Sequence, residues 1–525
     1  MVYSRMVLRE PISDLVRGDA GTLYFTETWE ARANGLPVSA TKLTELISPK
    51  PSEFRWVFLV IFSSTSYFLF LTLNYIHMTS RNYFQGKRIA VIGLGPHGEM
   101  VADAKFLIKE NALVSVYDLR SEARLKEHIV YLREAGLANY VCGSIPPDDL
   151  LDMDLIILSH EYPRDSSFLK AVKEKGIQIE YPETLFFRLA PPVTVVGVMG
   201  SCGKASVVSV LAPLLEAACE ADGTQRSFTL DPESDKGILA SLKRMKNGDI
   251  ALIRIIESMM RELRDMRISP HVAVFTTMPP AGSYDQSPFE ILANQTYNNF
   301  MIAPDEVVDA VHNFKYQLKA KMLRTKASII PADWGFCGNS SSGKAGELRS
   351  HDCENAALAL QAARLFKVSD DAARKILKDW KPLKGHLEPV KKVKNVEFYN
   401  DTASVSPDST IAGIRSLSDN RNLVLIMGGA DAGRDYRELY GVLPQCAHTV
   451  VLLPGSGTMK ERKVLQTLDH VEMLSAPSVE EAVRLARDHA RSGDRVLFSP
   501  AFAAAGFDAS RKERGERFVR AVRGL

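Results

Sequence analysis

The chain has no closely spaced cysteine pairs and no excess of charge of either sign. Its six cysteines lie far apart, which argues against a disulfide scaffold and a cysteine zinc site and favours a reducing compartment such as the cytoplasm. It carries 65 Lys and Arg against 63 Asp and Glu, a formal net charge of +2. This balance provides no broad basic surface, so we expect no nucleic acid partner and no general attraction to an anionic membrane.

The composition is that of a folded protein with several domains. Charged residues make up 24% of the chain and hydrophobic residues 46%, which excludes a wholly disordered chain. At about 150 residues for each domain, 525 residues correspond to three or four domains.

One long hydrophobic segment departs from this average. Residues 56–80 contain no Asp, Glu, Lys or Arg and lie between Arg55 and Arg81. A helix of this length can cross a bilayer core of about 30 Å. Three interpretations stay open: a membrane anchor, a buried helix or strand pair, and a leader outside a functional protein that begins at Met78. Membrane association could arise only through residues 56–78.

Beyond this segment, apolar strands alternate with helical stretches, which predicts an α/β fold with parallel sheets. We expect an N-terminal Rossmann-like domain, a central P-loop ATPase-like domain and a C-terminal Rossmann-like domain behind a hydrophobic N-terminal leader. The expected boundaries are an unassigned extension at 1–54, the hydrophobic segment at 55–80, and the three domains at 81–190, 191–345 and 346–525.

The first domain opens with a glycine turn after an apolar strand at 88–94. Gly93, Gly95 and Gly98 have the G-x-G-x-x-G spacing, and Asp118 follows about twenty residues later at the end of the next apolar stretch. Glycines allow a tight turn that exposes a helix N-terminus to phosphate, and the carboxylate can reach ribose hydroxyls. A nucleotide or nucleotide-sugar would fit, and a simple packing turn is the alternative.

The central domain opens with a second glycine loop. An apolar strand at 193–198 leads into residues 200–206 (GSCGKAS) and a helix. A strand, glycine loop, lysine and helix in this order cradle phosphates, with Lys204 on the outer phosphates. Ala205 stands where a hydroxyl normally meets Mg²⁺, and Ser206 comes one residue late. A glycine turn with a solvated lysine is the alternative.

In the third block, polar turns follow apolar strands. The block begins with an H-x-x-x-N pattern at 351–355 and a helix at 356–366, and turns rich in Asn, Asp or Ser follow strands at 400–404, 428–431 and 499–500. Ligands bind at the carboxyl ends of parallel strands, although these residue types are also good turn formers.

The order of these motifs resembles the Mur ligase family. The resemblance covers residues 82–525 and is strongest at 87–206 and 399–429. Within this family, the chain is similar in particular to the members that add D-glutamate to UDP-N-acetylmuramoyl-L-alanine in peptidoglycan synthesis. The resemblance implies a monomeric, ATP-dependent amide ligase that uses Mg²⁺ and forms an acyl phosphate on the substrate carboxylate.

The resemblance also implies roles for individual residues. The UDP group would lie near Gly95, Pro96, His97, Asp118 and Arg120. The ATP phosphates would be held by Gly200, Ser201, Cys202, Gly203, Lys204, Ala205 and Ser206. Asn355 and Asp401 would contact the nucleotide, and Thr402, Ser406 and Asp431 would lie near the cleft between domains. Lys204, Asn355 and Asp401 are thus the expected catalytic residues, and Ser206 and Glu257 the expected metal ligands.

Several family positions carry other residues. Arg254 stands at the position of a metal-binding Glu, and the remaining departures are Ala281–Gly282, Asn294, Leu387 and Ala504. Two functions therefore stay open. One is a ligase with a rebuilt metal shell that uses Glu257, Asp285 or Glu290. The other is a homologue without catalysis that binds nucleotide or UDP-sugar in a regulatory role.

Overall fold

The structure is a computed structural model. It describes the backbone of four strands before residue 64, and residues 83–525 apart from 96–97, 161, 163–165, 279–287, 314–317, 336, 338–349, 419, 432 and 505–510. The chain divides into two units, residues 1–78 and 79–525, which are described separately.

The first unit contains an antiparallel sheet in which the strands follow their sequence order. Its strands are β1 (Ile12–Arg17), β2 (Leu23–Ala33), β3 (Leu36–Leu46) and β4 (Val57–Ser63). Strand β4 lies within the hydrophobic segment, so residues 57–63 form a strand and not part of a membrane helix, and the rest of this segment lies outside the described residues. Its β-branched and aromatic residues favour a strand, and it pairs antiparallel with β3 along one edge. None of the helices in the described part of the chain has the length and apolar character needed to span a bilayer.

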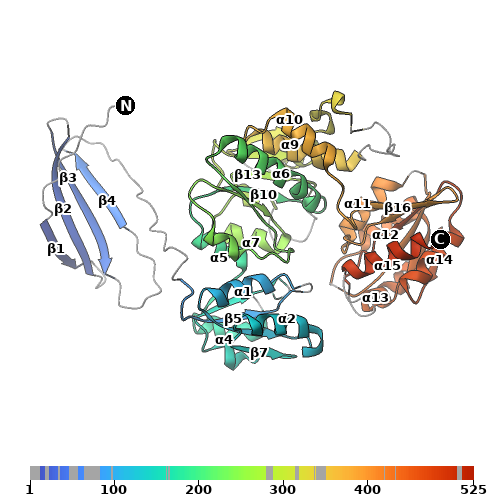
Figure 1. The fold of residues 1–525 in the computed structure, drawn as a ribbon, viewed down its shortest axis with the longest axis horizontal. Coiled ribbons are helices and arrows are strands. Elements are labelled where there is room, and N and C mark those ends of the chain that lie inside the picture. The colour runs from blue at the N-terminus through green and yellow to red at the C-terminus, as the bar shows by residue number, and fades with distance from the viewer. Residues whose placement is uncertain are drawn as a thin grey trace. The chain divides into compact units, whose positions relative to one another are not determined.

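The first α/β sheet has five parallel strands in the order β7-β6-β5-β8-β9 (Figure 1). Its strands are β5 (Arg88–Ile92), β6 (Leu113–Asp118), β7 (Asn139–Cys142), β8 (Leu155–Leu158) and β9 (Gln178–Glu180). Its helices are α1 (Val101–Lys109), α2 (Glu122–Glu134), α3 (Pro147–Leu150), α4 (Lys170–Glu174) and α5 (Pro182–Leu189). The strand order reverses direction at β5, and this is the point at which such sheets bind ligands.

The central sheet has six parallel strands in the order β11-β12-β10-β13-β14-β15. They are β10 (Thr194–Met199), β11 (Ser227–Leu230), β12 (Ile250–Arg254), β13 (Val272–Phe275), β14 (Phe300–Ala303) and β15 (Lys321–Arg324). The helices between the strands are α6 (Lys204–Asp222), α7 (Glu257–Asp265) and α8 (Asp305–Asn313).

Two further helices pack on this sheet through α6. They are α9 (Ser350–Arg364) and α10 (Asp370–Asp379), which are labelled near α6 in Figure 1. Their buried residues share one hydrophobic cluster with α6. The Trp380 indole also donates a hydrogen bond of 3.0 Å to the hydroxyl of Ser209 on α6. The assignment of these helices to the third domain is therefore corrected. Their apolar residues belong to the core of the central domain, and the sequence pattern alone does not show which sheet such residues cover.

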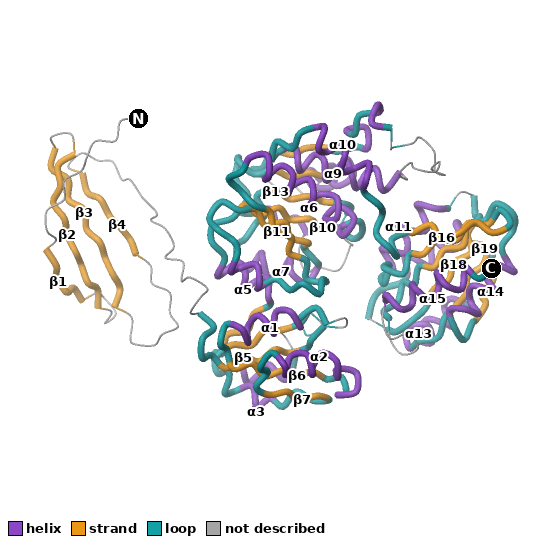
Figure 2. The backbone as a smooth tube through the Cα atoms, in the orientation of Figure 1, coloured by secondary structure: helices purple, strands orange, loops and turns teal. Residues whose placement is uncertain are grey.

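The last sheet has the order β16-β17-β21-β18-β19-β20 and is parallel except for β16. Figure 2 shows strands β16, β18 and β19 of this sheet. Its strands are β16 (Glu388–Val393), β17 (Val396–Asn400), β18 (Leu423–Met427), β19 (Ala447–Leu452), β20 (Glu472–Ser475) and β21 (Arg495–Phe498). Its helices are α11 (Pro407–Leu417), α12 (Arg437–Cys446), α13 (Ser456–Leu465), α14 (Val479–His489) and α15 (Arg511–Arg523). The three α/β sheets confirm the predicted fold class.

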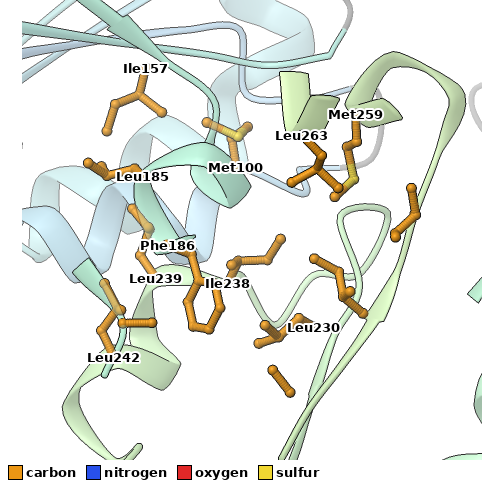
Figure 3. Close-up of a cluster of buried hydrophobic side chains, with 14 of the residues drawn as sticks. Met100, Ile157, Leu185, Phe186, Leu230, Ile238, Leu239, Leu242, Met259 and Leu263 are labelled. Atoms are coloured by element: carbon orange, nitrogen blue, oxygen red, sulfur yellow. The ribbon is translucent and has the colours of Figure 1, made fainter. Parts of the chain in front are cut away.

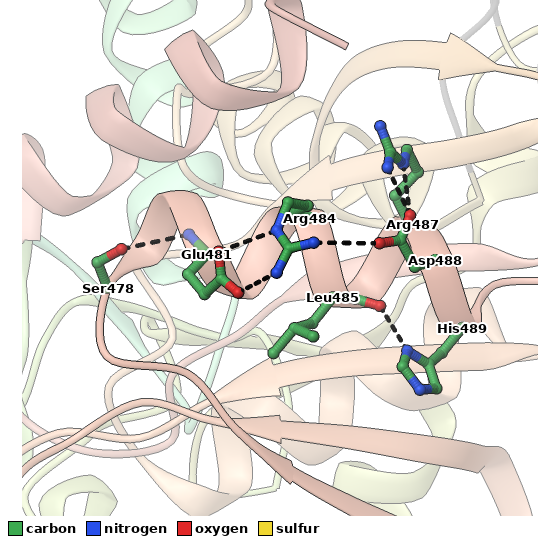
Figure 4. A network of polar contacts seen from close by, with 7 residues as sticks. All are labelled: Ser478, Glu481, Arg484, Leu485, Arg487, Asp488 and His489. Atoms are coloured by element: carbon green, nitrogen blue, oxygen red, sulfur yellow. Dashed lines mark hydrogen bonds and ion pairs between the residues drawn. The ribbon is translucent and has the colours of Figure 1, made fainter.

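Helix α14 shows how local sequence defines one of these elements (Figure 4). The Ser478 hydroxyl accepts a hydrogen bond of 3.2 Å from the Glu481 N–H and so caps the first turn. Arg484 forms ion pairs with Glu481 and Asp488, three and four residues away along the same helix face. Exposed pairs of this kind contribute little to stability, so the buried face of α14 fixes its place in the domain.

The first two α/β domains share a continuous hydrophobic core (Figure 3). Phe186 of α5 lies beside Leu239, which belongs to the short 3₁₀ helix η3 (Leu239–Lys243) of the central domain. A polar contact accompanies this packing. The buried Asp103 carboxylate on α1 accepts hydrogen bonds of 2.8 and 2.7 Å from the Ile238 and Leu239 N–H groups. The two domains are thereby joined by apolar burial and by hydrogen bonds.

Candidate functional site

The glycine loop of the central domain lies between β10 and α6 and requires two of its glycines. Gly200 has φ +133° and Gly203 has φ +81°, backbone conformations that L side chains rarely adopt. A Cβ at Gly203 would lie 2.7 Å from the Asn355 Oδ1 atom of α9. The structure therefore brings together Asn355 and the phosphate loop, which are about 150 residues apart in the sequence.

Two threonines that the sequence analysis did not select hold this loop in place. They follow β13, the strand beside β10. The Ser201 and Cys202 N–H groups donate to the Thr277 Oγ1 atom at 3.0 and 3.3 Å. The Thr276 hydroxyl donates to the Met199 carbonyl at 3.2 Å and also to the Cys202 carbonyl. The available signal was a pair of hydroxyl residues directly after a buried strand, where parallel sheets place binding groups.

Lys204 is folded back over the same loop. Its Nζ atom donates to the Gly200 carbonyl at 2.5 Å and to the Ser201 carbonyl at 3.2 Å. Burial raises the pKa of the neighbouring Cys202 thiol, which therefore stays neutral and adds no negative charge. The loop thus combines a positive ammonium with backbone N–H groups at a helix N-terminus, an arrangement that can bind phosphate oxygens.

The carboxyl end of β12 carries a cation beside the loop. Arg254 is 8% exposed and forms ion pairs of 2.6 Å with Asp231 and 2.7 Å with Glu233. Burial raises the pKa of the Asp231 carboxyl, and the Arg254 guanidinium opposes this shift. Arg254, identified from the sequence as a departure from the family, is thus a buried and paired charge.

The described residues do not fit a divalent metal at this place. Among them, no cluster of three His, Cys, Asp or Glu side chains could hold one. The expected ligand Ser206 is 6% exposed on α6, whereas Glu257 begins α7 with a side chain outside the described residues. Asp285 also lies outside them, and Glu290 forms an ion pair of 3.4 Å with Arg264. The metal ligands expected from the sequence remain predictions.

The other positions of the central domain that depart from the family differ in their surroundings. Asn294 is exposed, and its backbone N–H donates to the Ser269 hydroxyl at 3.1 Å. Ala281–Gly282 lies outside the described residues.

In the first domain, Asp118 connects the glycine turn to Arg120. Its carboxylate accepts from the Leu94 N–H at 3.0 Å and from the Arg120 guanidinium at 2.9 Å, and Arg120 donates to the Gly95 carbonyl at 2.8 Å. Burial alone would raise the pKa of Asp118, but the hydrogen bonds from Arg120 and Leu94 outweigh it, and the pKa lies below its usual value. A negative Asp118 therefore holds Arg120 at the turn.

Two residues predicted at this turn lie outside the described residues, and one residue that was not predicted contacts the turn. Pro96 and His97 lie outside the described residues. His128 of α2, which the sequence analysis did not select, lies against the turn: a Cβ at Gly98 would be 2.7 Å from its Cε1 atom. No spacing rule links a residue on the second helix to a turn after the first strand, so only the tertiary structure identifies it.

In the C-terminal domain, Asp401 lies at the centre of a buried polar network. Its carboxylate oxygens accept from the Leu387 N–H at 3.1 Å and from the Ser499 hydroxyl at 2.7 Å. The neighbouring Thr402 hydroxyl donates to the Asn400 amide oxygen at 2.8 Å. Asp401 and Thr402 thus order the ends of β17 and β21 within their own domain, and their contacts with a nucleotide or substrate remain predictions.

Asp431 and Ser406 also lie at strand ends or helix starts of this domain. Asp431, after β18, is exposed and accepts from Lys460 at 2.7 Å; this hydrogen bond lowers the pKa of its carboxyl. The Ser406 hydroxyl caps α11 by accepting from the Ser409 N–H at 3.3 Å. Both residues have a structural role, and their predicted place near the cleft between domains remains a prediction.

The structure also contains a cross-link that the cysteine spacing did not suggest. Cys337 and Cys353 form a disulfide with Cα atoms 5.9 Å apart, and Cys142, Cys202, Cys219 and Cys446 are free. Cys353 lies in the first turns of α9, two residues before Asn355. The sequence analysis argued against a disulfide scaffold, and this single cross-link joins residues 16 positions apart that the cysteine spacing did not mark as a pair.

Comparisons with known proteins support the resemblance. Residues 385–502 match the Mur ligase, glutamate ligase domain. A curated UDP-N-acetylmuramoylalanine–D-glutamate ligase of Desulfosudis oleivorans is 26% identical over 463 residues, 84% of this chain and 97% of that protein. The protein of the same name from Streptococcus agalactiae is 28% identical over 461 residues, 83% of this chain and 97% of its own length.

A solved structure supports the fold. The murein peptide ligase of Psychrobacter arcticus is 14% identical and has a TM-score of 0.51, with 84% of this chain and 99% of that chain covered. These findings confirm the resemblance to Mur ligases and the α/β fold of three domains expected from it.

Proposed function

We propose that this chain is an ATP-dependent ligase of the Mur type that extends a peptidoglycan precursor by one amino acid. The observation that carries the proposal is the phosphate loop, in which Lys204 and the Ser201 and Cys202 N–H groups lie between β10 and α6 with Asn355 against Gly203. A loop of this kind binds the phosphates of a nucleotide. The match of residues 385–502 to a ligase domain supports the reaction class.

The substrates proposed are UDP-N-acetylmuramoyl-L-alanine and D-glutamate. The names of the curated relatives support this choice. Arg120, held at the glycine turn by Asp118, places a positive charge where a diphosphate would lie beside a helix N-terminus. Ala504 provides no hydrogen-bonding side chain for the amino acid, so we expect other groups of the last domain to recognise the D-glutamate carboxylates.

In the proposed reaction, a substrate carboxylate oxygen attacks the γ-phosphorus of ATP, and the bond to ADP breaks. The amine nitrogen of the amino acid then attacks the acyl carbon, loses a proton and expels phosphate, which leaves an amide. Lys204 would neutralise charge on the transferred phosphoryl group, and the loop N–H groups would orient it. Catalysis by such a site consists mainly of positioning and charge stabilisation.

The test is phosphate release from ATP in the presence of both proposed substrates. We expect Lys204→Ala to lower the rate at least about a hundredfold, since positioned charges of this kind contribute on that scale. Lys375→Ala, a change at an exposed lysine of α10, is the matched control and keeps the wild-type rate. Equal rates for wild type and Lys204→Ala would refute the proposal.

A second function is favoured by Arg254. A buried guanidinium at the position expected for a metal-binding carboxylate favours a homologue that binds nucleotide or UDP-sugar without turnover. The two functions are distinguished by titration calorimetry with ATP and with UDP-N-acetylmuramoyl-L-alanine beside the phosphate-release assay. Binding without phosphate release identifies the second function.

A further inference from the structure

The position of Arg254 relative to the phosphate loop follows from the register of the central sheet. Strands β10 and β12 are parallel neighbours in which Val198 pairs with Arg254, and the Ile255 N–H donates to the Val198 carbonyl at 2.9 Å. The loop begins at Gly200, two residues after Val198. In P-loop ATPases, a carboxylate at the end of a strand and a loop hydroxyl together hold Mg²⁺. Here the corresponding strand end carries a guanidinium.

The alternation of β12 places Arg254 on the α6 face of the sheet. Ile250 and Leu252, four and two residues earlier, pack in one hydrophobic cluster with Val207 and Leu211 of α6. Successive side chains of a strand point to opposite faces, so Arg254 continues on the face of Ile250 and Leu252. Helix α6 begins with Lys204 and carries Ser206, and it is the element from which a loop hydroxyl would reach a metal.

The charges around Arg254 attract a divalent cation less strongly than a carboxylate at this position would. Arg254 with Asp231 and Glu233 gives one positive and two negative charges, a net charge of −1. A glutamate at position 254 would give three negative charges, a set of oxygen ligands that attracts Mg²⁺. The Arg254 side chain is 9% exposed, so the two carboxylates compensate a charge that is largely removed from water.

We propose that the phosphate loop binds nucleotide without a divalent cation held by β12, because the Arg254 guanidinium occupies that place. The proposal rests on the nucleotide site proposed above. A guanidinium also offers a planar set of N–H donors that suits phosphate oxygens. The affinity of this chain for nucleotide is therefore insensitive to Mg²⁺, in contrast to loops that bind the metal through a strand carboxylate.

The test is titration calorimetry of ADP and ATP against the full chain, once with excess Mg²⁺ and once with EDTA. We expect the two dissociation constants of the wild type to differ by less than about threefold, because the end of β12 carries a guanidinium where a carboxylate would hold the metal. Arg254→Glu restores a carboxylate beside Asp231 and Glu233, and we expect Mg²⁺ to tighten its binding at least about tenfold.

Two further variants serve as controls for this comparison. Lys375→Glu makes the same charge reversal on exposed α10 and keeps the wild-type ratio. Arg254→Lys keeps a cation and stays insensitive to Mg²⁺, and circular dichroism verifies that each variant is folded. If Arg254→Glu does not fold, the wild-type ratio alone decides.

A wild-type affinity that rises tenfold or more with Mg²⁺ would overturn the inference and leave the nucleotide site intact. Absence of nucleotide binding in both buffers would overturn the inference and the proposed function together.

Discussion

The contact between Asp103 and η3 predicts how pH acts on the joined first and central domains. Asp103 is 3% exposed, and its Oδ1 atom accepts both hydrogen bonds, from the Ile238 and Leu239 N–H groups. Burial, with a smaller contribution from Glu183, raises the pKa of this carboxyl to about 7, although the two hydrogen bonds oppose the shift. The Oδ2 atom can therefore carry a proton while Oδ1 keeps both bonds.

The sign of the effect follows from the direction of this shift. In the unfolded chain Asp103 loses its proton near pH 3.8, whereas in the folded chain it keeps the proton up to about pH 7. Between these values the folded state binds more protons, so stability falls as pH rises and then levels off above pH 7. At 1.36 kcal/mol for each pH unit, the loss amounts to about 4 kcal/mol as an upper bound.

Two variants isolate this contribution. Asp103→Asn is neutral at every pH and keeps an oxygen acceptor, so we expect its advantage in stability over the wild type to grow from about 2 kcal/mol near pH 5 to about 4 kcal/mol near pH 8, as upper bounds. Asp103→Ala leaves two buried N–H groups without an acceptor and should be about 2 to 4 kcal/mol less stable than Asp103→Asn at either pH. Urea unfolding at pH 5 and pH 8 gives the free energies.

Hydrogen exchange at the Ile238 and Leu239 amides locates the effect. At each pH, protection of a peptide that contains both residues is compared between wild type and Asp103→Asn, which cancels the intrinsic pH dependence of exchange. We expect lower protection in the wild type than in Asp103→Asn, with a larger difference near pH 8 than near pH 5. A difference between wild type and Asp103→Asn that does not change with pH would refute the reasoning.

Two further changes test the loop and the C-terminal network. Thr277→Val removes the acceptor of the Ser201 and Cys202 N–H groups and should lower the stability of the chain without nucleotide by about 1 to 3 kcal/mol. In thermal melts, we expect added ADP to restore the melting temperature of the variant. Equal melting temperatures of variant and wild type without ADP would contradict the assignment. Ser499→Ala removes a buried donor to Asp401 and should cost about 2 kcal/mol in urea unfolding; an unchanged midpoint contradicts this role.

Local patterns in the sequence predicted the elements that depend on neighbours along the chain. The apolar strand before Gly200, the glycine loop and the helix after it follow from short-range rules, because glycine permits positive φ and an apolar run forms a buried strand. The same rules predicted the turn at Gly93 to Gly98 and the parallel α/β class. The functional roles of the individual site residues remain predictions.

Other features depend on which elements pack together, and the sequence pattern does not contain that information. Helix α9 carries an apolar face that could cover either of two sheets, and its packing on α6 brought Asn355 to Gly203 and Cys353 to Cys337. Strand β4 shows the same limit: its apolar residues suit a membrane helix as well as a strand, and pairing with β3 decided between them.

The sequence by itself determined the α/β class, the two glycine loops and the presence of Arg254 where a carboxylate was expected. The tertiary structure alone decided what surrounds these residues. It brought the Thr277 hydroxyl within hydrogen-bond distance of the loop N–H groups, and it brought Asp231 and Glu233 into ion pairs with the Arg254 guanidinium. The physical reason is that a buried charge or N–H group must find a partner, and the partners came from other strands whose register only the folded sheet defines.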